Sequence, residues 1–171
     1  AAVGDKTATC TVTVKEEPLQ SISLNKTSME LVKTENETLE VTYNPVDTTD
    51  DKTVTWTSAN TGVATVENGV VTGVGVGTTT ITATVGNKTA TCDITVTSPL
   101  KGIKVNPADV TVLKNQSQTV SVEYLPADTT DEKAVTWKSS NTDVATVDEN
   151  GVITVEQDHC SVYLLTTTKL T

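Results

Sequence analysis

The chain repeats itself with a period of 81 residues, and this repeat limits the folds that it can adopt. The segment PLQSISLN begins at Pro18 and returns as PLKGIKVN at Pro99. The segment DTTDDKTVTWTSANTGVATV, which contains Trp56, returns as DTTDEKAVTWKSSNTDVATV around Trp137. The opening TATCTVTV of residues 7–14 matches TATCDITV near the end of the first copy. Self-similarity at a fixed period predicts tandem copies of one structural unit.

The repeat divides the chain into three parts joined by short linkers. The similarity ends abruptly after Thr154, so the last strands of the second copy are predicted to be absent or rewritten. A frameshift, an artificial junction or a divergent tail would each produce such a break, and all three stay open at this point. The opening has no basic and apolar leader, so we do not expect an intact secretory precursor. The predicted parts are residues 1–17 (the last strand of a preceding domain and linker 15–17), 18–97 (a complete domain) and 99–171 (a second domain, after the linker residues Thr97 and Ser98).

Each copy is expected to form short β-strands. Residues 39–43 and 53–56 alternate between apolar and polar side chains, as half-buried strands do. Thr occurs 37 times and Val 26 times, and both residue types are β-branched and favour strands over helices. About seven short strands in about 80 residues fit an antiparallel β-sandwich. Turns are predicted at Asn44-Pro45, Asn60, Asn68-Gly69, Gly73 and Gly86-Asn87.

The same alternation predicts the hydrophobic core, with one Trp of each copy at the centre of its sandwich. A domain of about 80 residues buries roughly 60–65% of its unfolded surface, so each copy is expected to fold alone. The predicted core residues of the first copy are Leu24, Leu39, Val41, Val54, Trp56, Ala64, Val66, Val71, Ile81 and Ala83. Those of the second copy are Val105, Val120, Val122, Val135, Trp137, Ala145, Val147 and Ile153.

Several local features together resemble one known family. They are the W-x-S-x-N segment (Trp56, Ser58 and Asn60), the V-A-T-V strand, the N-G-V-V-T turn, the closely spaced glycines and the T-x-T-I-T-A-T strand. In these features, residues 18–154 resemble the bacterial immunoglobulin-like domains of group 2, as found in invasin- and intimin-like surface proteins. The resemblance implies tandem immunoglobulin-like (Ig-like) antiparallel β-sandwiches with neighbouring Ig-like domains as partners. Such arrays occur in adhesins, in envelope-associated enzymes and in phage fibres, and the family has no shared catalytic residues.

Charge and composition exclude several classes of function. The net charge is −10 and the chain has no Arg, which argues against nucleic-acid binding because phosphate contacts come from clusters of Lys and Arg. A single His argues against a His-based catalytic triad or a multi-His metal site. No apolar run is long enough to cross a bilayer, so membrane insertion is not expected. We therefore predict no catalytic residue, no cofactor and no metal site.

Two loop motifs have alternative interpretations. Residues 47–51 (DTTDD) and 128–132 (DTTDE) could supply carboxylate oxygens to Ca²⁺. The favoured interpretation is a solvated turn, because Asp and Thr bond to nearby backbone and no EF-hand spacing follows. Residues 73–77 (GVGVG) superficially resemble a dinucleotide-binding loop. A strand and not a helix is predicted to follow them, so a tight turn is favoured.

The three cysteines and the single histidine indicate no chemistry. Cys10 and Cys92 occupy equivalent repeat positions, too far apart for a disulfide, and are interpreted as small apolar strand residues. Because the cysteine count is odd, at least one thiol stays free or pairs between chains. His159 and Cys160 are adjacent, and neighbours in an extended chain point to opposite faces, so a catalytic pair is not expected.

Glycan chemistry has two weak signals. Asn-x-Ser/Thr sequences start at Asn25, Asn36, Asn87 and Asn115, and in a bacterial source they are chance matches. Aromatic platforms for sugars are scarce, since the only tyrosines are Tyr43, Tyr124 and Tyr163. The first two occupy equivalent positions before a Pro turn, so a structural role is predicted for them.

The function expected from these observations is that of a non-catalytic extracellular stalk or spacer. Adhesion to a host surface protein or glycan, through loops near Asn60 and Asn141, is an additional expectation. A phage head or tail module and an accessory module of a secreted glycan-active enzyme remain alternatives. Because residues 1–14 resemble a spare strand and the second copy lacks its own last strands, self-association by strand exchange is also expected.

Overall fold

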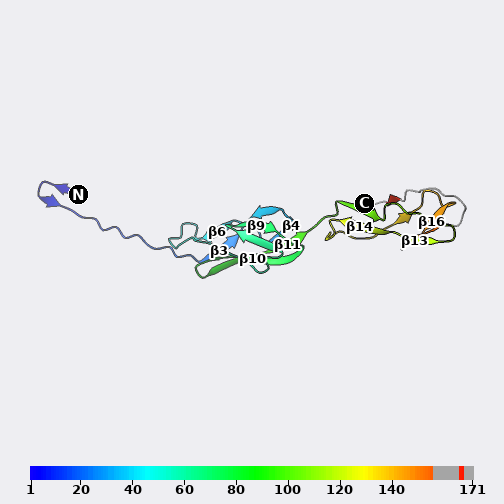
Figure 1. Ribbon diagram of the computed structural model, residues 1–171. Coiled ribbons are helices and arrows are strands. Elements are labelled where there is room, and N and C mark those ends of the chain that lie inside the picture. Colours follow the sequence, from blue (N-terminus) through cyan, green and yellow to red (C-terminus); the bar gives the residue numbers. More distant parts are fainter. Residues whose placement is uncertain (156–165, 168–171) are drawn as a thin grey trace. The chain divides into compact units, whose positions relative to one another are not determined.

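The computed structural model describes residues 1–155 and 166–167 of the chain (Figure 1). These residues belong to two compact units, Ala1–Val96 and Thr97–Thr171. The described residues form β-strands and no helix, so the all-β prediction is confirmed. Accordingly, none of them contributes to a helix that is long and apolar enough to span a membrane.

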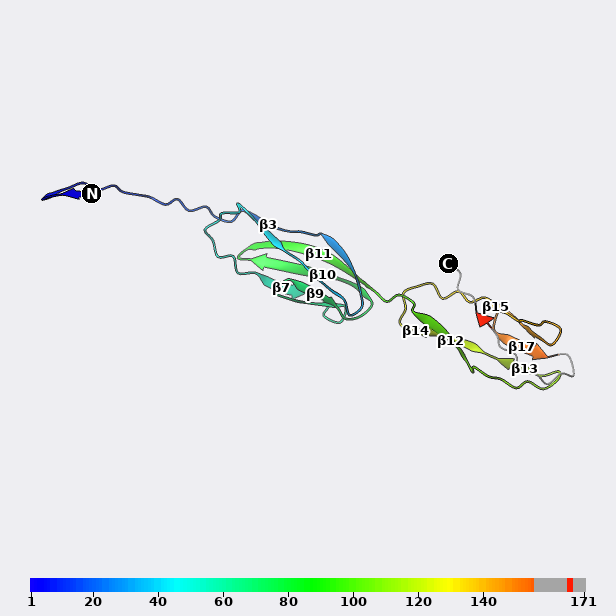
Figure 2. The same ribbon diagram turned by 90° about the horizontal axis from the view of Figure 1, so that it is seen from above.

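The first unit is built from short strands, which in chain order are β1 (Ala2–Val3), β2 (Lys6–Thr7), β3 (Ser21–Leu24), β4 (Ser28–Val32), β5 (Asn36–Thr38), β6 (Val41–Asn44), β7 (Thr55–Ser58), β8 (Ala64–Glu67), β9 (Val70–Gly73), β10 (Gly77–Val85) and β11 (Lys88–Thr97). One layer is the sheet β4-β11-β10-β7. The opposite layer consists of the sheet β5-β9-β8 and the pair β3-β6 (Figure 2). This arrangement is the antiparallel β-sandwich expected from the turn spacing.

The hairpin of β10 and β11 is the longest element of the first unit. Its antiparallel register runs from Gly77 opposite Val96 to Val85 opposite Lys88. The turn is Gly86-Asn87, as predicted, and Gly86 has a φ of 56°, a conformation that glycine adopts without a steric penalty. Inward and outward side chains alternate along both strands, because successive residues of a strand face opposite sides of the sheet.

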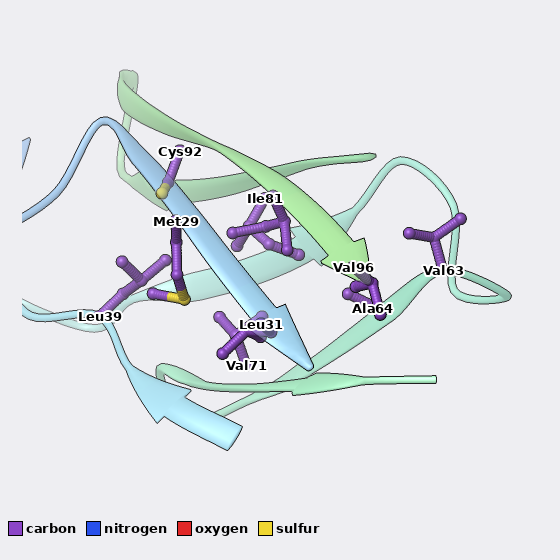
Figure 3. Packing of buried hydrophobic residues seen from close by; sticks show 10 residues of the cluster. Met29, Leu31, Leu39, Val63, Ala64, Val71, Ile81, Cys92 and Val96 are labelled. Carbon is purple, nitrogen blue, oxygen red and sulfur yellow. The ribbon is translucent and has the colours of Figure 1, made fainter. Parts of the chain in front are cut away.

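The main core lies between the two layers of the first unit (Figure 3). In β11, Cys92, Ile94 and Val96 are essentially fully buried. They pack with residues of β4, β8, β9 and β10, and Trp56 lies partly buried against them. A second cluster joins the ends of β3 and β10 and includes Ile22 and Val85. All ten core residues predicted for the first copy belong to these two clusters.

Several core residues of the first unit were not predicted. Met29 and Leu31 of β4 are buried and alternate with the exposed Ser28 and Glu30, so the strand pattern is present in the sequence here too. The other unpredicted members are Leu19, Ile22, Val63, Val85, Cys92, Ile94 and Val96. The interpretation of Cys92 as a small apolar strand residue is confirmed, since its thiol is buried and free.

The second unit repeats the strands of the first as far as the structure describes them, except at the β4 position, where residues 109–113 form no strand. They are β12 (Gly102–Asn106), β13 (Ser117–Thr119), β14 (Ser121–Leu125), β15 (Trp137–Lys138), β16 (Ala145–Val147), β17 (Val152–Val155) and β18 (Thr166–Thr167). The pair β12-β14 corresponds to β3-β6, and the sheet β13-β17-β16 corresponds to β5-β9-β8. The pair β15-β18 corresponds to β7-β10, because Trp137 lies opposite Thr167 as Trp56 lies opposite Ala83. The rewritten tail therefore supplies a short strand at the β10 position.

The core that is described in the second unit is smaller than that of the first. Its buried members are Val120, Ala145 and Ile153, with Val105, Trp137 and Val147 among the partly buried residues around them. Val122 and Val135 were predicted to belong to this core, but they are only half-buried and lie outside the cluster. Their counterparts in the first unit pack against Ala83 and Val85 of β10; in the second unit Thr167 takes the strand position of Ala83, and the position of Val85 lies outside the described residues.

The segment near the N-terminus was predicted to be the last strand of a preceding domain, and this stays a prediction, since that domain lies outside the printed sequence. Residues 8–20 contain no strand, and β1 and β2 pair only with each other. The matching segment of the first unit lies in β11, which is hydrogen-bonded to β4 on one side and to β10 on the other. A strand is stable only with a neighbouring strand, so the same sequence stays unpaired where it has none.

Candidate functional site

The Asp-Thr-Thr-Asp loop of each unit holds the segment through which the chain enters that unit. In the first unit, Glu17 N donates a hydrogen bond to Thr49 Oγ1 (3.2 Å), and Thr49 N donates to Glu17 O (3.0 Å). Thr48 Oγ1 also donates to Glu17 O (2.8 Å). Leu19 N donates to Asp50 Oδ2 (2.8 Å). We call these contacts between residues 17–19 and 48–50 the inlet clasp.

The second unit has an equivalent inlet clasp, formed by residues 98–100 and 128–131. Ser98 N donates to Thr130 Oγ1 (3.2 Å), and Thr130 N donates to Ser98 O (2.8 Å). Leu100 N donates to Asp131 Oδ2 (3.0 Å). Ser98 Oγ adds a hydrogen bond to Asp128 Oδ1 (3.3 Å), and Ser98 is buried. Because three of these hydrogen bonds occur at equivalent positions in both copies, the clasp is a property of the repeat.

A tyrosine and a lysine brace the same loop in each unit. Tyr43 OH donates to Lys52 O (3.0 Å), and Tyr124 OH donates to Lys133 O (2.7 Å). The ammonium groups of Lys52 and Lys133 lie 5.4 Å and 5.3 Å from the centres of the two rings, within the range of a cation–π interaction. The predicted structural role of Tyr43 and Tyr124 is confirmed, whereas Tyr163 lies outside the described residues.

Two of the three carboxylates of the first loop, those of Asp50 and Asp51, already accept hydrogen bonds within the protein. Asp50 accepts the Leu19 amide, and Asp51 Oδ1 accepts Thr53 N (2.9 Å) and Thr53 Oγ1 (2.7 Å). These two bonds from Thr53 hold the pKa of Asp51 below its ordinary value, because they stabilise the charged form. The described residues include no group of three His, Cys, Asp or Glu side chains that could hold a metal ion. The side-chain-to-backbone bonding of the solvated-turn interpretation is therefore observed.

The GVGVG segment is a tight connection between two strands. It joins β9, which ends at Gly73, to β10, which begins at Gly77, so the predicted strand does follow it. A Cβ atom at Gly75 would lie 2.6 Å from Gly62 O, which explains why this position has no side chain. The tight-turn interpretation is confirmed.

The loop residues expected to contribute to adhesion shape their own turns. Asn60 Oδ1 accepts Gly62 N (3.0 Å), and Asn141 Oδ1 accepts Asp143 N (3.0 Å). These are the local turns that Asn side chains commonly stabilise. His159 and Cys160 lie outside the described residues, and Cys10 is an exposed free thiol. The Asn-x-Ser/Thr positions Asn25, Asn36, Asn87 and Asn115 are all exposed.

One exposed surface was not predicted as a candidate site. The outer side of the sheet β4-β11-β10-β7 carries an array of threonines, which we call the threonine face. Cross-strand register places Thr82 opposite both Thr91 and Thr57. The alternating sequence of β10 could have revealed the threonine face, because every outward residue of this strand is Thr. The face consists of Thr55, Thr57, Thr78, Thr80, Thr82, Thr84, Thr89, Thr91 and Thr95.

Comparison with known proteins assigns the family. Residues 18–96 and 99–158 match the family model of the bacterial Ig-like domain (group 2). The chain belongs to this family. The fold prediction of tandem Ig-like β-sandwiches is therefore confirmed, and group 2 domains have a non-enzymatic Ig-like fold.

Two curated relatives are similar over most of this chain. Ice-binding protein 1 of Shewanella frigidimarina is 35% identical over 158 residues, which cover 88% of this chain and 18% of that protein. An uncharacterised protein of Clostridium acetobutylicum is 32% identical over 137 residues, which cover 78% of this chain and 14% of that protein. The two group 2 domains thus span less than a fifth of either relative.

Solved structures with tandem domains are also similar to the chain. Domains 4–9 of the surface layer protein SbsC align with 92% of this chain and 32% of that one, at 24% identity and a TM-score of 0.44. Human protocadherin-24 EC1-2 aligns with 81% of this chain and 78% of that one, at 12% identity and a TM-score of 0.42.

Proposed function

We propose that these two group 2 domains are a non-catalytic spacer in a bacterial extracellular protein. The observation that carries the proposal is the second inlet clasp. Strand β11 extends to Thr97, and the next residue, Ser98, is already hydrogen-bonded to Thr130 of the second unit.

The clasp supports this function because it removes the freedom of the linker. Each unconstrained residue adds two soft backbone torsions to a linker. A chain that passes directly from a paired strand into a clasp has little of this freedom, so the junction resists bending. The net charge of −10 keeps such an array soluble and disfavours collapse of one domain on another.

Tumbling of the two units in solution tests the proposal. Amide ¹⁵N relaxation gives a rotational correlation time for each unit separately. We expect both units of the unmodified chain to tumble with the slow time of one body. Insertion of Gly-Ser-Gly-Ser between Thr97 and Ser98 is expected to shorten both times.

The matched control carries the same insertion in the turn at Gly86-Asn87, which lengthens the chain without touching the junction. It should tumble as the unmodified chain does. If the units of the unmodified chain already tumble as fast as those with the inserted linker, the spacer proposal is wrong.

A second candidate function is adhesion through the threonine face. This surface is broad and exposed, and its hydroxyl groups suit a polymer rich in hydroxyl groups, such as a polysaccharide. Asp93 of β11 lies among these threonines, and Thr80 Oγ1 donates to Asp93 Oδ1 (2.9 Å). The exchange of Thr82, Thr84 and Thr91 for Val retains the β-branched shape and removes the hydroxyl groups.

Binding to mucins, matrix proteins and polysaccharides, with and without Ca²⁺, tests adhesion. Ice belongs in the same panel, because one relative is named for ice binding. Saturable binding that the triple Val variant loses would support the threonine face as the site. Binding that the variant keeps, or no binding at all, would contradict it.

The same spacer would also suit a phage head or tail protein or a secreted glycan-active enzyme. The rest of the parent gene and its neighbours distinguish these hosts: a wall anchor favours a surface protein, virion genes favour a phage, and a catalytic domain favours an enzyme.

A further inference from the structure

We propose that tension applied along the chain is borne, in the first unit, by the neighbouring strands β4 and β11, which are pulled past each other in shear. The inlet clasp and β3 yield first and only lengthen the chain. The proposal goes beyond the spacer function, because a unit can resist tension whether or not its junction is stiff. Its failure would leave the tumbling result unchanged.

The chain enters and leaves the first unit at opposite ends of the longest hairpin (Figure 2). Leu19, at the entry, packs in one cluster with Val85, the last residue of β10. Val96, at the exit, lies opposite Gly77, the first residue of β10. The nine residues of β10 rise about 3.4 Å each, so tension acts at two points roughly 27 Å apart and is directed along the strands.

Strands β4 and β11 lie side by side and run in the same direction. Just before β4 begins, Thr27 O accepts a hydrogen bond from Asp93 N in the middle of β11 (3.0 Å). The ends of both strands lie beside Gly73, where an added Cβ would be 3.3 Å from Val32 O and 3.2 Å from Val96 Cγ1. Their arrows accordingly point the same way in Figure 3, whereas β10 and β11 are antiparallel.

This common direction decides how the pair is loaded. Tension reaches β4 from its start, on the entry side, and reaches β11 from its end, on the exit side. The two strands are therefore pulled past each other along their length. Because the hydrogen bonds of a parallel ladder are evenly spaced along the pair, they resist this movement together. A pair that is pulled apart from one end breaks its hydrogen bonds one after another.

Sliding of β4 also disrupts the main core. Met29 and Leu31 of β4 are 6% and 4% exposed. They pack in one cluster with Cys92, Ile94 and Val96 of β11. Since successive residues of a strand face opposite sides, a shift by one residue would turn both side chains of β4 out of the core. Apolar contacts and hydrogen bonds thus oppose the same movement.

The inlet clasp and β3 offer less resistance. The clasp depends on hydrogen bonds from residues 17–19 to a single loop. Strand β3 pairs with β6 over Ser21–Leu24, and Ile22 is the buried residue among these four. Release of the clasp and β3 frees residues 17–27 and leaves the pairing of β4 with β11 in place.

Single-molecule force spectroscopy of the whole chain, with two different attachment points, tests the proposal. Both chains carry Cys160→Ser and have one handle at the C-terminus. In the shear arrangement, the other handle is on the exposed thiol of Cys10, upstream of the clasp. In the peeling arrangement, Cys10→Ser and Glu35→Cys move this handle to the exit side, since Glu35 O accepts a hydrogen bond from Gly73 N (3.0 Å).

Peeling from Glu35 loads β4 and β11 from the same end. Glu35 is exposed, so its exchange is expected to leave folding unchanged. The second unit is loaded identically in both arrangements and serves as the internal control. The chain length that each opening releases identifies the unit. At about 3.6 Å for each extended residue, residues 18–96 release up to about 28 nm in shear, and residues 35–96 release up to about 22 nm in peeling.

We expect the first unit to open in shear at a force at least about twofold higher than in peeling, because forced opening follows the unfolding rate along the pulled direction. Thr48→Val separates the clasp from the strand pair. This variant should leave the shear force unchanged, since the clasp has already opened when β4 and β11 are loaded. Thr57→Val, on the threonine face, is its matched control.

The proposal is overturned if the first unit opens at the same force in both arrangements, since the direction of β4 and β11 would then not matter. It is equally overturned if Thr48→Val lowers the shear force more than Thr57→Val does. The inlet clasp would in that case bear the tension.

Discussion

The hydroxyl group of Thr48 is the centre of the first inlet clasp, and its removal provides a direct measure of what the clasp contributes. Thr48 is 6% exposed. Its Oγ1 donates to Glu17 O (2.8 Å) and accepts from Asp50 N (3.3 Å). Thr48→Val keeps the shape of the side chain and removes both bonds. At about 1 kcal/mol for each net hydrogen bond, the variant should lose roughly 2 kcal/mol of unfolding free energy.

This loss corresponds to a clear change in thermal stability of the first unit. For a domain of 60–100 residues, 1 kcal/mol lowers the midpoint by about 4–8 °C, so Thr48→Val should lower it by roughly 8–16 °C. Amide NMR signals of β10 and β11 report this unit alone. The second unit, followed through β12 and β14, should keep its midpoint.

Thr57→Val is the matched control, because it makes the same chemical change on the exposed threonine face. Its effect should stay within about 0.5 kcal/mol, as for other surface substitutions. The reasoning is refuted if Thr48→Val lowers the thermal midpoint of the first unit no more than Thr57→Val does. The hydrogen bonds of Thr48 in the loop 47–51 would then contribute nothing to the stability of the unit.

Three further predictions follow from local geometry. Gly75→Ala should destabilise the first unit by about 1–3 kcal/mol in urea unfolding, because its Cβ would lie 2.6 Å from Gly62 O; an unchanged midpoint would contradict this close approach. Burial raises the pKa of the Cys92 thiol, so at mildly alkaline pH this thiol should react with a thiol reagent far more slowly than the exposed Cys10. The difference between the two reaction rates should vanish in denaturant. Equal rates in the native protein would contradict the buried position of Cys92. Calorimetric titration with Ca²⁺ should give no saturable heat, because the carboxylates of Asp50 and Asp51 already accept hydrogen bonds; a saturable signal that is lost on removing these two carboxylates would show that Ca²⁺ displaces these bonds.

Local patterns in the sequence predict most of the first unit. Alternation of apolar residues predicts the strands and the inward positions, and Asn68-Gly69 and Gly86-Asn87 mark turns whose glycines have positive φ. These features depend on neighbours a few residues apart. They are therefore visible in a single sequence.

Contacts between distant residues were not predictable in the same way. The inlet clasp joins Glu17 to Thr49, more than thirty residues away, and the motif DTTDD indicates a turn but not its partner. Residues 7–14 show the opposite case. Their sequence matches that of β11, yet residues 8–14 belong to no strand, because pairing depends on a neighbour that the local sequence does not specify.

Both halves of each inlet clasp lie within one 81-residue repeat, and this has a consequence at the level of the gene. Residues 98–100 are held by 128–131 of the same unit. Recombination that adds or deletes whole repeats therefore leaves every junction with the same hydrogen bonds. An array of this kind can change its length between strains in steps of one domain, without any new junction having to evolve.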